Sequence, residues 1–67
     1  MRDESRRFLD AIQALPPRQA DCIILRFYED LAEADVADTL GISRSTVSTH
    51  IERGLATLTP LLEDNDD

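Results

Sequence analysis

The 67 residues of this chain limit it to a single domain with a small hydrophobic core. Its composition, 42% hydrophobic and 31% charged residues, is that of a soluble folded protein and excludes a disordered chain. The net charge of −7 argues against a free-standing DNA-binding protein, for which an excess of basic residues is typical.

Other classes of protein are excluded by what the sequence lacks. The single cysteine, Cys22, cannot form an internal disulfide and is expected to be a small buried apolar residue, and no His/Cys group has metal-site spacing. The only histidine, His50, has no companions arranged for nucleophilic catalysis, and no glycine-rich loop could hold a phosphate. The longest apolar run, residues 22–25, is far short of the about 20 residues of a membrane span, and no signal peptide follows Met1. We therefore expect a cytoplasmic protein that is not an enzyme and uses no metal or cofactor.

Apolar spacing predicts two helices in the first half of the chain. Residues 3–14 form the first, and a proline pair ends it, because proline disfavours the helical conformation of the residue before it. Pro17 suits the first turn of a second helix, which is expected to run to about residue 28. The apolar residues of the first helix are Phe8, Leu9, Ile12 and Leu15. The stripe expected to face inward on the second is Ala20, Ile23, Ile24 and Phe27.

Two more helices are predicted in the second half. A short helix over residues 32–40 should end at Gly41, which can take the left-handed conformation. Ser43 is a good N-cap for a fourth helix over residues 44–58. The apolar stripe of that helix is Val47, Ile51, Leu55 and Leu58.

The end of the chain is predicted from a proline and a run of acids. Pro60 is expected to close the fourth helix or to kink it. The acidic residues 63–67 are expected to be disordered, so that the folded domain spans residues 1–62.

Residues 31–58 have the organisation of a helix-turn-helix: a short helix, a glycine-centred turn and a longer helix. Ile42 would fix the corner, and apolar residues of both helices would hold them at a steep angle. This leaves one face of the fourth helix free for the major groove of DNA, although such a polar face can also be a merely solvated surface. The residues of this face are Arg44, Ser45, Ser48, Thr49 and Glu52.

The chain resembles region 4 of the sigma-70 family of bacterial RNA polymerase sigma factors, in the extracytoplasmic-function branch. The resemblance covers about residues 8–58. It rests on ALPPRQ (14–19), ILRFYEDL (24–31), ADVA (34–37), LGIS (40–43), TVSTH (46–50) and RGLA (53–56). It implies an all-α domain of four helices with a C-terminal helix-turn-helix, similar to a winged helix but without a wing.

The resemblance also implies a function. In this family the domain contacts the −35 element of double-stranded promoter DNA through the second helix of the motif, grips the β flap of RNA polymerase, and is often masked by an anti-sigma factor. The residues implied on the base side are Arg44, Ser45, Ser48 and Thr49. Those implied at the DNA backbone are Ser43, Thr46, His50 and Arg53.

The sequence departs from the family pattern at three places. Ala32 stands where a capping serine is frequent, unless Asp30 caps the third helix instead. Position 48, often basic, is Ser48, and residues 54–58 lack the usual arginines. Fewer phosphate contacts predict weak DNA binding by the isolated domain, which tethering to polymerase would offset.

Two alternatives to the sigma interpretation remain open at this point. A LuxR-type regulator has a similar motif, but the sequence before it, at residues 15–19 and 26–31, favours sigma. Such a regulator would usually dimerise through its last helix. A module that keeps the fold but binds only protein would account for the acidic charge and the missing basic residues.

Overall fold

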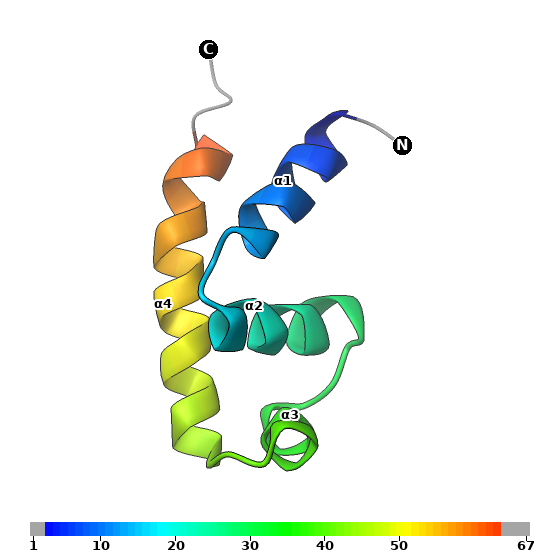
Figure 1. Ribbon diagram of the computed structural model, residues 1–67, viewed down its shortest axis with the longest axis vertical. Coiled ribbons are helices and arrows are strands. Elements are labelled where there is room, and N and C mark those ends of the chain that lie inside the picture. The colour runs from blue at the N-terminus through cyan, green and yellow to red at the C-terminus, as the bar shows by residue number, and fades with distance from the viewer. Residues whose placement is uncertain (1–2, 64–67) are drawn as a thin grey trace.

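A computed structural model describes residues 3–63, with side chains for residues 6–60. Its helices are α1 (Asp3–Gln13), α2 (Pro17–Ile23), α3 (Glu33–Leu40) and α4 (Arg44–Glu63), and a π-helical segment, η1 (Ile24–Tyr28), continues α2. Helix α4 runs along the length of the molecule, and the other helices follow one another along one side of it (Figure 1). The expected all-α fold of four α-helices is confirmed, and residues 3–63 contain no strand.

The hydrophobic core consists of two clusters that α4 joins. The first lies between α1, α2 and α4, and its buried residues are Ile12, Leu15, Ala20, Ile23 and Leu58. The second lies between α2, α3 and α4, and its buried residues are Cys22, Val36, Ala37, Val47 and Ile51. Leu55 packs against both clusters. Because α4 belongs to both, the position of the helix-turn-helix is set by the first two helices as well as by α3.

Two residues of α2 and α4 illustrate how tightly this core is packed. Cys22 is fully buried, as expected, and burial raises the pKa of its thiol. Gly54 is buried where α4 meets α2, and a Cβ atom there would overlap Cδ1 of Ile23. A larger residue at position 54 would therefore require the Ile23 side chain to shift, a constraint that the sequence analysis did not identify.

The end of the second helix differs from the prediction. From Ile24 the helix is π-helical, and the N–H of Glu29 donates to the carbonyl of Ile24 at 3.1 Å, five residues earlier. This wider turn changes which residues face inward. Phe27, predicted on the inward stripe, and its neighbour Tyr28 are each 51% exposed. The assignment of Phe27 to the core was therefore wrong.

Helix α3 begins without a side-chain cap. Ala32 is its N-cap residue, and no side-chain hydrogen bond caps the helix there. Asp30, the possible substitute, takes a left-handed conformation with φ of 60° and does not fill this role. The start of α3 thus lacks the side-chain acceptor that usually caps a helix.

The turn between α3 and α4 is built as predicted. Gly41 is left-handed, with φ of 71°, and the N–H groups of Gly41 and Ile42 donate to the carbonyl of Ala37 at 2.8 and 3.1 Å. The hydroxyl of Ser43 accepts a hydrogen bond from the N–H of Thr46 at 3.1 Å, which confirms Ser43 as the N-cap of α4.

The far end of α4 extends beyond the predicted boundary. The helix continues to Glu63, with Pro60 inside it, so the first of the two expected outcomes, closure of the helix at Pro60, was wrong, and the second, a kink, stays a prediction. Proline lacks the N–H that would bond to the carbonyl of Ala56, and both residues are exposed, so that water can solvate the free carbonyl. Glu63 is helical, and the rest of the predicted disordered tail, residues 64–67, lies outside the described residues. No helix of residues 3–63 is long and apolar enough to cross a membrane.

Candidate nucleic-acid interface

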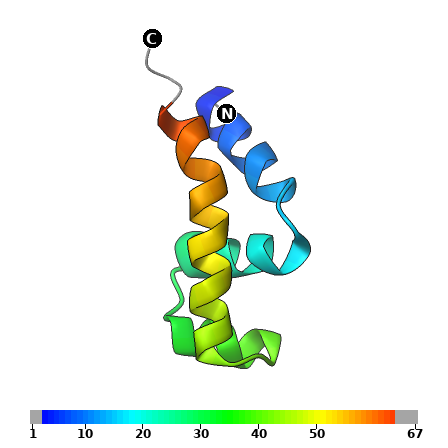
Figure 2. The same ribbon diagram turned by 90° about the vertical axis from the view of Figure 1, so that its left-hand side faces the viewer.

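Helices α3 and α4 cross at a steep angle and form the helix-turn-helix (Figure 1). Val36 and Ala37 of α3 pack against Val47 and Ile51 of α4, and all four are buried. The opposite side of α4 is left uncovered by the other helices (Figure 2). The N-terminal half of this uncovered side, with the turn before it, is called the reading face below. Its exposed residues are Ser43, Arg44, Ser45, Thr46, Thr49, Glu52 and Arg53.

A cluster of hydroxyl groups occupies the N-terminal end of α4. The Ser43 hydroxyl lies 2.7 Å from the Thr46 hydroxyl and 3.2 Å from that of Ser45, and all three residues are exposed. The N-terminus of a helix carries a partial positive charge and free N–H groups, which favour a phosphate. The cluster therefore lies where a backbone contact to DNA is chemically suited.

Charged side chains flank this cluster. Arg44 and Arg53 are exposed, and neither forms an ion pair with another side chain of residues 6–60. Within that part of the chain the single ion pair, Arg18–Asp21 at 4.0 Å, lies on α2. Both guanidinium groups on α4 are thus available to an external anion or base edge. The negative charge of Glu52, on the same face, would repel an anion.

One predicted base-side residue has a different environment from the others. Ser48 is only partly exposed, and its hydroxyl donates a hydrogen bond of 2.6 Å to Oε1 of Glu33 at the start of α3. Arg44, Ser45 and Thr49 share the reading face, and Ser48 lies at its edge against α3. Sequence reasoning missed Glu33, because the two residues are 15 positions apart and no local pattern links them.

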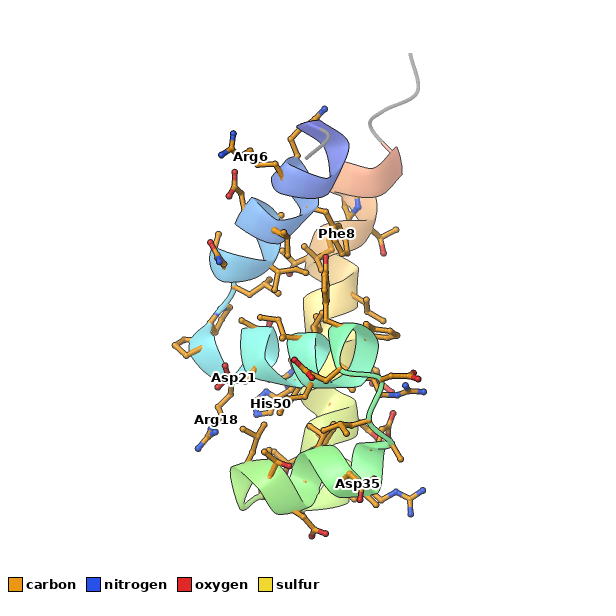
Figure 3. All side chains as sticks on the ribbon, turned by 90° about the vertical axis from the view of Figure 1, so that its right-hand side faces the viewer. Arg6, Phe8, Arg18, Asp21, Asp35 and His50 are labelled. Carbon is orange, nitrogen blue, oxygen red and sulfur yellow. The ribbon has the colours of Figure 1, made fainter. Side chains whose placement is uncertain are left out.

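His50, predicted at the DNA backbone, is set apart from the other predicted contacts. Its side chain is half-buried, and Nδ1 is buried without a hydrogen-bond partner among the described residues. It lies below α2, toward the end that carries Arg18 and Asp21 (Figure 3). Of the predicted backbone contacts, Ser43, Thr46 and Arg53 thus share the reading face and His50 does not. Their roles toward DNA stay predictions.

A second exposed surface lies at η1, the end of α2 that is farther from α4 (Figure 1). Phe27 and Tyr28 are half-exposed there, and the guanidinium carbon of Arg26 lies 5.5 Å from the centre of the Phe27 ring. We call these two aromatic residues the aromatic edge. No group of described residues could hold a metal ion.

The family model for sigma-70, region 4, matches residues 5–58. The chain belongs to the sigma-70 region 4 family. This confirms the resemblance found in the sequence, and it favours the sigma interpretation over a LuxR-type regulator. Region 4 is a DNA-binding helix-turn-helix domain, in agreement with the geometry of α3 and α4.

Individual relatives agree with the family. The chain is 37% identical to the ECF RNA polymerase sigma factor BldN of Streptomyces coelicolor over 57 residues, 85% of this chain and 22% of BldN. It is 36% identical to the RNA polymerase sigma-E factor of Streptomyces antibioticus over 87% of this chain and 32% of that protein. A solved structure of the RsbN–BldN complex superposes with a TM-score of 0.80 and 32% identity, covering 88% of this chain and 43% of the matched chain. The chain thus spans a third or less of the length of these curated relatives.

Proposed function

We propose that this domain recognises the −35 element of double-stranded promoter DNA, as region 4 of an extracytoplasmic-function sigma factor, while the β flap of RNA polymerase holds it in place. The observation that carries the proposal is the uncovered reading face of α4 in a chain of the sigma-70 region 4 family. Its N-terminal end is capped by Ser43 and carries exposed arginine and hydroxyl side chains.

In this proposal the N-terminal half of α4 enters the major groove. The first turn approaches a phosphate with its free N–H groups and with the hydroxyls of Ser43 and Thr46. Arg44, one residue into the helix, carries the donors that suit O6 and N7 of guanine. Arg53, more than two turns further along the helix, approaches the phosphates of the flanking groove wall.

The charge distribution supports a domain that depends on polymerase for its affinity. Residues 21–40 contain one basic and six acidic residues, whereas residues 41–58 contain two basic residues and one acidic residue. Two arginines on α4 can neutralise few phosphates, and the DNA affinity of a protein rises steeply with their number. Tethering to polymerase would compensate for this low affinity, because it holds the domain at a high effective concentration near the promoter.

We further propose protein partners on the other side of the domain. The aromatic edge is exposed, and aromatic residues are common anchors of protein interfaces. The polymerase β flap is one candidate partner. An anti-sigma factor is another, supported by the likeness of this chain to a sigma factor solved in complex with a second protein.

The test selects duplexes from a random-sequence pool at low salt and then measures the binding of the chain to a labelled selected duplex by fluorescence anisotropy. We expect weak, saturable binding that Arg44→Ala lowers by about tenfold, the value of one good base contact. Arg18→Ala is the matched control, because it removes an arginine on α2, away from the reading face. Equal losses in the two variants, or no binding to any duplex, would contradict the proposal.

A further inference from the structure

We propose that Glu33 and Ser48 form a pair of hydrogen-bond acceptors at the edge of the reading face, and that this pair selects a cytosine in the recognised sequence. The inference rests on the proposed function of α4. It adds to that function a specificity-determining residue, Glu33, that lies outside the recognition helix.

The contact between the two residues is unusual within this structure. The Ser48 hydroxyl donates to Oε1 of Glu33 at 2.6 Å across 15 positions. Every other side-chain hydrogen bond of the described residues joins positions no more than four apart. Its length is typical of a hydroxyl bound to a carboxylate, a bond stronger than one between neutral groups. Ser48 is therefore held against α3 and does not rotate freely.

This bond determines what the pair can offer to DNA. A serine hydroxyl has a single proton, and here it is directed at Glu33. The remaining lone pairs of Ser48 and the carboxylate oxygens of Glu33 can only accept hydrogen bonds. A phosphate oxygen, O6 and N7 of guanine, and O4 of thymine are acceptors as well, so the pair cannot bind them.

Cytosine is the base whose major-groove edge fits the pair. It presents the N4 amino group as a donor and no acceptor, and carboxylates are suited to this group. Adenine also has an amino group, but its N7 acceptor lies beside it and would face the acceptors of the pair. The pair therefore favours cytosine over the other three bases.

The position of the pair relates the cytosine to the base that Arg44 contacts. Ser48 follows Arg44 by four residues, so both lie on the same side of α4, one helical turn apart. One turn rises about 5.4 Å, and base pairs are spaced by about 3.4 Å, so the two contacts fall about one to two base pairs apart. This edge of the reading face therefore presents donors at Arg44 and, one turn later, acceptors at Ser48 and Glu33. A helix that carries only freely rotating hydroxyl groups has no such fixed order of donors and acceptors.

A purely structural role of the contact predicts a different result. If the hydrogen bond only held α3 against α4, its loss would lower the stability of the domain, or its affinity for all duplexes equally. The relative preference among the four bases at one position would then not change. Base preference is therefore the measurement that separates the two roles.

The experiment selects duplexes from a randomised pool with the 67-residue chain and then measures competition by duplexes that differ at single positions. We expect one position, next to or one step from the position sensitive to Arg44→Ala, to favour cytosine by about tenfold. Glu33→Gln keeps the shape of the side chain but adds a donor, and should reduce this preference to less than about threefold. Ser48→Ala, which removes the hydroxyl that holds Glu33, should weaken the same preference.

Asp38→Asn is the matched control, because it removes one exposed charge from α3 with no described side-chain hydrogen bond. It should raise overall DNA affinity slightly, as Glu33→Gln also does, and leave the cytosine preference intact. Circular dichroism should show that all variants are folded. Cytosine favoured at no position, or a preference unchanged in Glu33→Gln, would overturn the inference while leaving DNA binding in place. Failure of the parent chain to bind any duplex would overturn the proposed function as well.

Discussion

The reading face of α4 and the aromatic edge of η1 differ in almost every property. The reading face carries hydroxyl groups, two arginines and the carboxylate of Glu52 on a helix fixed by both core clusters. The aromatic edge is apolar, lies at the end of a helix that widens into a π-turn, and is followed by acidic residues. In the proposed function, DNA contacts the first surface and a protein partner contacts the second.

The largest effect is expected from a substitution that unfolds the domain, because unfolding abolishes the reading face and the aromatic edge together. Val47 is fully buried between α3 and α4, and Val47→Asp would place an unpaired charge in the core. The penalty of several kcal/mol is comparable to the about 3–5 kcal/mol that a core of this size supplies, so the domain should unfold. Circular dichroism and thermal melting measure this, with Thr49→Asp on the exposed side of α4 as the control. A cooperative melt of Val47→Asp like that of the parent would contradict the assigned core.

The next largest effect is expected from a substitution that impairs the aromatic edge and leaves the reading face unchanged. Phe27→Ser should lower the affinity for a β-flap fragment by about tenfold or more, because buried aromatic anchors dominate protein interfaces. DNA binding by the isolated chain should stay the same, since η1 lies away from the reading face. Tyr28→Phe keeps the aromatic surface and is the control. Unchanged flap affinity in Phe27→Ser would remove the aromatic edge from that interface.

A smaller effect tests the packing that positions α4 against α2. Gly54→Ala gains helix propensity of about 1 kcal/mol but forces an overlap with Ile23 that costs about 1–3 kcal/mol. A net loss of about 1 kcal/mol would lower the melting temperature by about 4–8 °C. In a chain that also carries Ile23→Val, which lacks the overlapping atom, Gly54→Ala should no longer destabilise. The same loss in both backgrounds would show that the overlap is not the cause.

The smallest effect concerns the uncapped start of α3. Ala32→Ser supplies a side chain that can accept an N–H of the first turn, and should stabilise the domain by about 0.5–1 kcal/mol in denaturant unfolding. Ser43→Ala, which removes the existing cap of α4, should destabilise it by a similar amount. Both variants should leave the aromatic edge intact. A destabilised Ala32→Ser would contradict the description of this helix start.

The helix-turn-helix could be predicted because its signals are local. Gly41 and Ser43 act within a few residues of themselves, one by its left-handed conformation and the other by capping. The spacing of Val47 and Ile51 identified the buried side of α4 for the same reason. Six of the eight predicted base-side and backbone residues therefore lie together on the reading face.

Most of the features that were missed depend on contacts between distant segments. The overlap that a Cβ atom at position 54 would make involves Ile23, which no sequence window around Gly54 contains. The π-turn that exposes Phe27 is local, since its hydrogen bond joins residues 24 and 29, but the regular helical period used for the prediction does not reveal it. The bond from Ser48 to Glu33 and the half-buried position of His50 depend on how α4 sits against α3 and α2. The spacing of apolar residues and the identity of capping residues do not predict such contacts.

An NMR titration of the isotope-labelled chain tests most directly whether DNA and polymerase bind to separate surfaces of the domain. A duplex carrying a selected site is added first at low salt, and a β-flap fragment second. We expect shifts at residues 43–49 with the duplex, and saturable shifts elsewhere, including Phe27 and Tyr28, with the flap. Flap-induced shifts centred on residues 44–49, or no shifts with the duplex, would contradict this expectation.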